Sequence, residues 1–184
     1  MEKILFINAC VRPFSRTLEL AKHVLSKLSG DIEEVKLYNE QLLPLDLEEM
    51  ELRDKSAISR DFTHCSFNCA KQFANADEII IAAPFWDLSF PAKLKIYLEQ
   101  ITVSGITFKY LNGHPSGLCK AKKLTYITTS GGPIFDDFGY AYVKTLAQKF
   151  YGIEKTEAVR AMNLDVDLIS AEELLEKSTI SVVE

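Results

Sequence analysis

The sequence lacks long hydrophobic runs and any excess of positive charge, and each absence excludes a class of protein. No apolar segment approaches the roughly 20 residues that a membrane-spanning helix needs. The 21 Lys and Arg residues are outnumbered by 26 Asp and Glu residues, and no basic stripe offers a surface for a nucleic acid backbone. We therefore expect neither a membrane nor a nucleic acid as a partner.

Cysteine is also scarce, with four residues at positions 10, 65, 69 and 119. The amino terminus, MEKILFINA, has an acid where an export signal has a basic region, so we expect reduced thiols in a cytoplasmic protein. His64, Cys65 and Cys69 form an incomplete zinc set, and cysteines one helical turn apart are typical of an ordinary half-buried helix face. No metal site is predicted.

The 184 residues, 47% of them hydrophobic, suit one globular domain over residues 1–184. Apolar or alternating runs predict strands at 3–9, 32–38, 78–83, 124–128 and 157–163. The spacing of apolar residues predicts helices at 15–28, 61–75, 91–102, 140–151 and 171–177, and 39–60 is expected to be loop and weak helix. Strands that alternate with helices predict a parallel sheet covered on both faces, with residues 32–38 near its edge.

Residues 103–123 interrupt this alternation. Turn-forming residues are dense there, and residues 106–110 alternate like a short edge strand or one arm of a hairpin. The segment is either a plain surface excursion, or a flap beside a ligand site or a dimer contact.

The most informative stretch is residues 79–95, IIIAAPFWDLSFPAKLK. Its apolar start is typical of a strand buried on both faces, and Pro91 suits the first turn of a following helix. Ligands of open α/β sheets bind in the loops that follow the carboxyl ends of the strands. The loop here is rich in large apolar groups, which a flat aromatic cofactor would cover. Its candidate residues are Pro84, Phe85, Trp86, Asp87 and Leu88.

Two other loops are expected at the same edge of the sheet. The first loop (residues 8–17) leads into a helix, where Ser15, Arg16 and Thr17 and the free N–H groups of the first turn form a candidate phosphate site. Ser15 equally suits a simple helix N-cap, and the two uses are compatible.

The third loop (residues 128–138) carries two consecutive glycines, which let the backbone approach a flat ligand closely. A plain turn from a strand to a helix explains the same Ser-Gly-Gly sequence. The candidate residues of this loop are Thr129, Ser130, Gly131 and Gly132.

The first loop also has the spacing Cys-x5-Arg-Thr, at Cys10, Arg16 and Thr17, which is that of the phosphate loop of low-molecular-weight tyrosine phosphatases. There a cysteine thiolate attacks phosphorus. That mechanism needs nearly every N–H of the loop pointing inward, but Pro13 has none. The chain also has no Asp-Pro pair to supply a general acid. A phosphatase that uses Cys10 is therefore a minor alternative.

The three loops together resemble those of the FMN-dependent NADH-azoreductases and, more loosely, of the DT-diaphorase-type quinone reductases of the flavodoxin-like superfamily. The resemblance covers residues 3–151 and implies a flavodoxin-like three-layer fold, with a five-stranded parallel sheet and helices on both faces. It is carried by the motifs Ala83-Pro84 through Pro91-Ala92-x-Leu94-Lys95, Gly105-Ile106-Thr107-Phe108-Lys109-Tyr110 with Gly117-Leu118 and Lys122-Lys123, Thr128-Thr129-Ser130-Gly131-Gly132, and more weakly Ser15-Arg16-Thr17.

The resemblance implies a role for each loop. The first loop would hold the FMN phosphate, the second loop (residues 84–90) would wrap the isoalloxazine, and the third would contact its pyrimidine edge. FMN would carry the chemistry, so no catalytic side chain is expected. NAD(P)H would be the cosubstrate and a quinone or azo compound the two-electron acceptor, in a ping-pong cycle. The resemblance also implies a homodimer with the site at its interface.

The sequence departs from the family pattern at several points, among them Ala9-Cys10, the loop 133–140 and the second loop, where Asp87 matters most. Asp87 stands where family members often have Asn, and an ionised carboxylate only accepts hydrogen bonds. It would repel the flavin carbonyl oxygens and lower the flavin potential, or point elsewhere. A family member that no longer binds FMN therefore stays open as an alternative. A flavodoxin-type electron carrier, which the acidic composition suits, stays open as well. The choice between NADH and NADPH and the physiological acceptor stay open as well.

Overall fold

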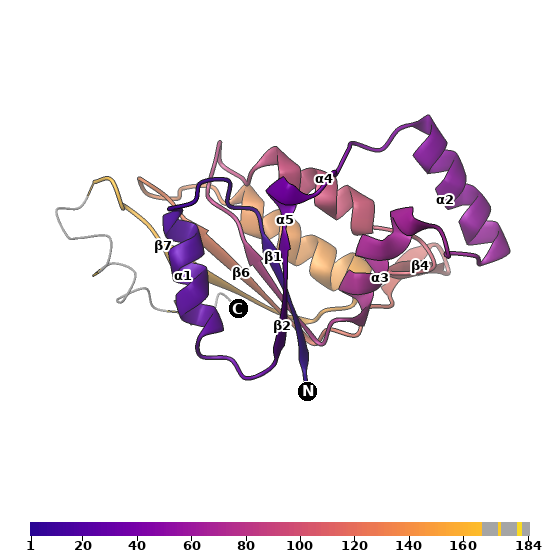
Figure 1. The fold of residues 1–184 in the computed structure, drawn as a ribbon, viewed down its shortest axis with the longest axis horizontal. Coiled ribbons are helices and arrows are strands. Elements are labelled where there is room, and N and C mark those ends of the chain that lie inside the picture. Colours follow the sequence, from indigo (N-terminus) through magenta and orange to yellow (C-terminus); the bar gives the residue numbers. More distant parts are fainter. Residues whose placement is uncertain (167–172, 174–179, 182–184) are drawn as a thin grey trace.

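The computed structural model describes residues 1–166, 173 and 180–181 and is built around one twisted sheet (Figure 1). The strand order is β2-β1-β3-β6-β7-β8, in which the first five strands are parallel. β8 runs antiparallel beside β7. The strands are β1 Lys3–Asn8, β2 Asp31–Lys36, β3 Glu78–Ala82, β6 Lys123–Thr129, β7 Lys155–Ala161 and β8 Ile180–Ser181. The predicted five-stranded parallel sheet is confirmed, and β8 adds a sixth strand that was not predicted.

Helices cover both faces of the sheet, as predicted. They are α1 Arg16–Leu25, α2 Leu47–Ser59, α3 Asn68–Asn75, α4 Ala92–Ile101 and α5 Phe138–Leu146. A π-helical turn, Ala147–Tyr151, extends α5 and ends at Gly152, whose φ of 77° is the left-handed conformation that glycine adopts most readily. Short 3₁₀ turns lie at Leu37–Asn39 and Cys65–Phe67.

The central strand β3 explains why the core has two halves. Ile79 and Ile81 belong to a cluster with α3, α4 and α5, whereas Ile80 and Ala82 belong to a second cluster with α1. Successive side chains of a strand point to opposite faces, so a strand covered on both sides must be apolar throughout. All four of these side chains are fully buried. The unbroken apolar run in the sequence is thus a direct consequence of the central place of β3.

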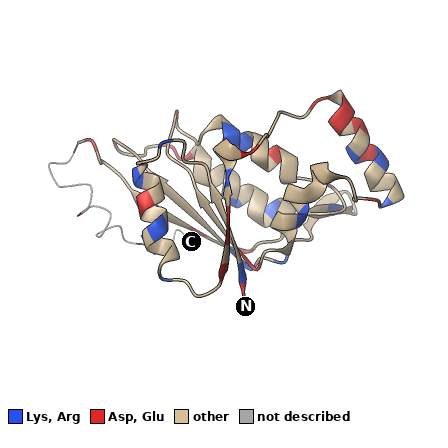
Figure 2. Ribbon diagram, viewed as in Figure 1, with Lys and Arg blue, Asp and Glu red and all other residues tan. Residues whose placement is uncertain are grey.

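α2 is a helix of 13 residues within 39–60, where loop and weak helix were expected. The side chain of Asp46 accepts a hydrogen bond from the Glu49 N–H at 2.9 Å and caps the helix, and Arg60 ends it in the left-handed conformation. The helix protrudes from the body, and charged residues follow one another along it (Figures 1 and 2). Capping and charge thus support a helix that apolar periodicity alone marked only as weak.

Residues 103–123 contain a separate two-stranded antiparallel hairpin, β4 Phe108–Leu111 and β5 His114–Gly117. Asn112 and Gly113 form its turn with φ of 52° and 80°. Gly117 packs directly on Gly152, since a Cβ there would lie 2.1 Å from the Gly152 nitrogen. Thr107 is buried and donates to the Ile101 carbonyl at the end of α4 at 2.8 Å. The predicted hairpin arm is confirmed. Thr107 and Gly117, which belong to the motif shared with the family, attach the hairpin to the body.

Two further helices need comment. The expected helix at 61–75 begins only at Asn68, because the His64 side chain accepts from the Ser66 N–H and sets up a 3₁₀ turn first. The expected final helix at 171–177 lies outside the described residues apart from Glu173. Within the described part of the chain, no helix is long and apolar enough to cross a membrane.

Candidate functional site

The three loops named above meet at the carboxyl edge of the sheet and enclose a pocket of about 270 Å³. This is the edge at which open α/β sheets bind their ligands. The residues that line the pocket are Val11, Arg12, Phe14, Ser15, Arg16, Thr17, Pro84, Phe85, Trp86, Thr129, Gly131 and Asp165.

The first loop presents the amino terminus of α1 to the pocket. The Ser15 side chain accepts from the Leu18 N–H at 3.4 Å, so the N-cap interpretation of Ser15 is confirmed. The first intrahelical bond runs from the Glu19 N–H to the Ser15 carbonyl, at 3.0 Å. The N–H groups of Arg16 and Thr17 precede this bond and stay available to an anion. The cap and the anion site therefore coexist at one helix end.

A buried hydroxyl pair joins the first loop to the third. The Thr17 and Thr129 side-chain oxygens lie 2.6 Å apart, and both residues are at least nine-tenths buried. The Phe85 N–H then donates to the Thr129 carbonyl at 3.1 Å and ties in the second loop. The three loops thus form one hydrogen-bonded rim.

The second loop turns tightly at its exposed tip. Trp86 and Ser89 exchange backbone hydrogen bonds of 3.1 and 2.8 Å, which makes a two-residue hairpin turn. Its central residues, Asp87 and Leu88, have φ of 49° and 66°. Such a turn needs a positive φ at both central positions, where Asn, Asp and Gly are common and a leucine is strained. The Leu88 carbonyl accepts from the Phe138 N–H at the start of α5, which holds the turn in place.

The third loop is hydrogen-bonded to the end of β7 and to the loop that follows it. The Ser130 N–H donates to the Ala161 carbonyl, and the Asp165 N–H donates to the Gly131 carbonyl. A Cβ on Gly131 would lie 2.0 Å from an Asp165 carboxylate oxygen, whereas a Cβ on Gly132 would meet nothing within 4 Å. Gly131 is therefore required by close approach, and the approaching group within the chain is Asp165.

Most of the candidate residues come together, but four do not line the pocket. Eight do so: Ser15, Arg16, Thr17, Pro84, Phe85, Trp86, Thr129 and Gly131. Asp87 and Leu88 lie at the exposed tip of the second loop, and the Ser130 hydroxyl donates to the Gly132 carbonyl instead. The roles of these residues toward a cofactor stay predictions.

Sequence reasoning missed two charged residues of the pocket, Arg12 and Asp165. Arg12 lies in the first loop beside the residues that were chosen, so its charge was a usable signal. Asp165 follows β7, and it contacts the pocket residues Gly131 and Arg16, the latter by an ion pair of 2.8 Å. No spacing in the sequence predicts that contact.

The first loop does not provide a reactive thiol. Burial raises the pKa of Cys10 to about 11, against a smaller opposite effect of its hydrogen bond with Ser15. The thiol is therefore neutral near pH 7, whereas nucleophilic attack on phosphorus needs the thiolate. This finding removes the chemical basis of the phosphatase alternative.

Comparison with known proteins decides between the remaining interpretations. A family model that describes a flavodoxin-like fold matches residues 2–182. An FMN-dependent NADH:quinone oxidoreductase of Coprothermobacter proteolyticus is 37% identical over 182 residues, which cover 90% of this chain and 89% of the relative. The chain belongs to the flavodoxin-like family of FMN-dependent NADH:quinone oxidoreductases. The resemblance seen in the three loops is thereby confirmed.

Solved structures of this family have the same fold. An azoreductase from Bacillus anthracis str. Sterne superposes with a TM-score of 0.85 at 25% identity, and covers 97% of this chain and 95% of its own. An FMN-dependent NADH-azoreductase from Bacillus anthracis str. Ames Ancestor, solved in complex with FMN, gives a TM-score of 0.80 at 26% identity and covers 97% and 94%.

The residues of the pocket fit the FMN of this family. Its anionic end is matched by the free N–H groups at the start of α1 and by the guanidinium groups of Arg12 and Arg16. Its aromatic end is matched by Phe85 and Trp86. Among the described residues that line the pocket, the carboxylate of Asp165 is the one negative group that would repel the phosphate, and it pairs with Arg16.

Proposed function

We propose that the protein is an FMN-dependent NADH:quinone oxidoreductase that reduces quinones or azo compounds by two electrons in a ping-pong cycle. The observation that carries this proposal is the convergence of three loops, in a chain of this family, on one pocket with a cationic end and an aromatic end. When bound, FMN takes a hydride from NADH and passes two electrons to the acceptor, which is chemistry that no side chain supplies.

The side chains bind and orient. The amino terminus of α1 and the two arginines hold the phosphate, while Trp86 and Phe85 cover part of the ring. Trp86 keeps 38% of its surface exposed, so that end of the pocket stays accessible to a second planar molecule. Hydride transfer requires the nicotinamide to lie over the flavin at contact distance, so an open ring face is a requirement of the reaction.

Asp87 makes no hydrogen bond or ion pair with any described residue, and it is exposed at the tip of its turn. Its position follows from the turn geometry, which tolerates Asp at a positive φ. We assign it a turn-forming role first. Any effect on the flavin potential then depends on the carboxylate turning toward the ring.

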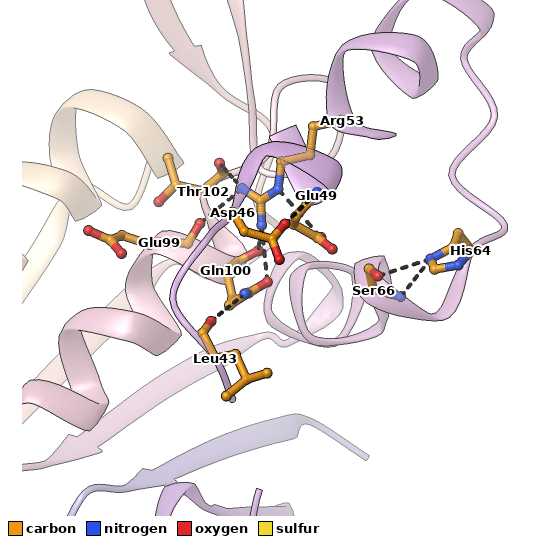
Figure 3. Close-up of polar contacts among 9 residues, drawn as sticks. All are labelled: Leu43, Asp46, Glu49, Arg53, His64, Ser66, Glu99, Gln100 and Thr102. Carbon is orange, nitrogen blue, oxygen red and sulfur yellow. Dashed lines mark hydrogen bonds and ion pairs between the residues drawn. The ribbon is translucent and has the colours of Figure 1, made fainter. Parts of the chain in front are cut away.

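We also propose that the protein acts as a homodimer in the cytoplasm. The protruding α2 supports the dimer, because it carries exposed apolar side chains, Leu47 and Ile58 among them, beside a largely apolar groove of about 490 Å³. Arg53 fixes α2 to the carboxyl end of α4 by bonds to the Glu99, Gln100 and Thr102 carbonyls, so this surface is held rigidly (Figure 3). Four unpaired cysteines support a reducing compartment.

A visible spectrum tests the proposed activity. Purified protein incubated with FMN and then desalted should be yellow, lose its colour on addition of NADH without oxygen, and regain it with menadione. A flavodoxin-type carrier would bind FMN but show no NADH oxidation with menadione. Protein that stays colourless after incubation with FMN would refute the proposal.

A further inference from the structure

Asp165 contacts residues at both ends of the pocket, Arg16 at the phosphate end and Gly131 at the ring end. Its Oδ1 accepts from Arg16 Nη1 at 2.8 Å. Its Oδ2 lies against Gly131, 2.0 Å from where a Cβ would stand. Its backbone N–H donates to the Gly131 carbonyl at 2.9 Å. Among the described residues that line the pocket, Asp165 is the only acid.

This placement creates a conflict with a bound phosphate. Arg16 Nη1 is already engaged by the Leu164 carbonyl at 3.0 Å and by the Asp165 carboxylate. A phosphate at the start of α1 would bring a second anion to the same guanidinium, close to the first. Like charges at such separations oppose each other, and the opposition grows where solvent is displaced. Arg12 is the other cation that lines the pocket, and within the described residues Asp165 forms its ion pair with Arg16 rather than with Arg12.

We propose that Asp165 competes with the flavin phosphate for Arg16, and that it thereby sets how strongly the protein prefers FMN to riboflavin. Binding of FMN exchanges the carboxylate for the phosphate on Arg16 and frees the approach to Gly131. This inference rests on the proposed function, because it concerns the cofactor of that site. Asp165 acts as a specificity-determining residue and takes no part in the electron transfer.

A structural role would have the opposite consequence. If Asp165 served only to hold Arg16 toward the pocket, its neutral analogue would loosen Arg16 and weaken FMN. If it competes, the neutral analogue tightens FMN. The sign of a single substitution therefore separates the two.

The test is Asp165→Asn, with dissociation constants for FMN and riboflavin measured by quenching of flavin fluorescence at fixed ionic strength. FMN should bind about tenfold more tightly than in the wild type, the scale expected when one like charge is removed near a phosphate. Riboflavin, which lacks the phosphate, should stay within about twofold. Asp31→Asn at the start of β2 makes the same change of net charge away from the pocket and should alter neither constant.

Repeating the substitution in an Arg16→Gln background tests whether Asp165 affects FMN binding through Arg16. In that background, Asp165→Asn should tighten FMN binding less, because the guanidinium for which the carboxylate and the phosphate compete is absent. An FMN constant that is unchanged or weaker in Asp165→Asn would overturn the inference, and so would equal tightening of both flavins. Wild-type protein that binds neither flavin would refute the proposed function itself, a result distinct from these. The Asp165 side chain is 66% exposed, so the substitution leaves the core intact.

Discussion

The two ends of the pocket differ in how firmly their side chains are held. At the phosphate end, Ser15 and Thr17 are buried and hydrogen-bonded before any ligand is considered. At the ring end, Trp86 is 38% exposed. The difference matches what each end has to do. A phosphate is bound once and kept, whereas the ring must be reached by NADH and then by an acceptor.

Removing the cation at the phosphate end should have the largest effect. Arg16→Ala should weaken FMN by about 1–3 kcal/mol, because a charge-assisted bond to the phosphate is lost. Riboflavin affinity should hardly change. Fluorescence titration with both flavins measures this, with Lys22→Ala on α1 as the control for charge. Unchanged FMN affinity would show that the helix amino terminus holds the phosphate alone.

Breaking the buried hydroxyl pair should affect stability as well as binding. Thr17→Val leaves the Thr129 hydroxyl buried without its partner, which should lower the free energy of unfolding by about 2 kcal/mol. The double variant Thr17→Val/Thr129→Val should lose less free energy of unfolding than the sum of the two single variants, since no hydroxyl is then buried without a partner. Urea unfolding measures both. Thr145→Val on α5, an exposed position, should stay within about 0.5 kcal/mol.

A change at the ring end should act on the two flavins alike. Trp86→Ala should weaken FMN and riboflavin equally, by about 1 kcal/mol, because the lost contact is with the ring that both share. The free energy of unfolding should barely move, since the side chain is partly exposed. A loss confined to FMN would place Trp86 at the phosphate end and contradict the division of the pocket.

Relief of the strained turn should have a small effect. Leu88→Gly removes a side chain from a left-handed conformation at φ 66° and should raise the free energy of unfolding by about 0.5 kcal/mol, after the entropy of glycine in the unfolded chain is counted. The backbone bond from Phe138 to the Leu88 carbonyl is kept. A loss of stability in urea unfolding would mean that the leucine side chain packs more than its exposure suggests.

The thiol of Cys10 in the first loop should be unreactive toward alkylating agents near neutral pH. Because the pKa of Cys10 is raised to about 11, the thiol is protonated at pH 8 and should resist iodoacetamide, while the exposed Cys65 is labelled. Labelling of Cys10 should begin only as the pH rises toward 11. Peptide mass spectrometry after timed alkylation distinguishes the two sites. Rapid labelling of Cys10 at pH 8 would reopen the phosphatase alternative.

The sequence predicted those features that depend on local pattern. The apolar run of β3 and the loops that follow β1, β3 and β6 were all visible, because a strand buried on both faces and a ligand loop have distinct compositions. The features that it missed depend on distant contacts. Asp165 lies in the pocket beside Gly131 and pairs with Arg16, which is 149 positions away in the chain. β8 exists only by pairing with β7.

One local feature was understated and another was missed, for a different reason. α2 is stabilised by its Asp46 cap and its charges more than by an apolar face, so hydrophobic periodicity understated it. The turn at Asp87 and Leu88 lacks the glycine that normally marks a positive φ, so its backbone geometry was hidden. Asp87 was expected either to act on the flavin or to point elsewhere, and in the structure it occupies a central position of that turn.

A crystal structure of the protein with FMN tests the division of the pocket most directly. The phosphate should lie at the N–H groups of Arg16 and Thr17, with the Asp165 carboxylate moved off Arg16 Nη1, and the isoalloxazine should lie against Trp86 and Gly131. A phosphate bound anywhere else, or a ring buried at the start of α1, would contradict the account.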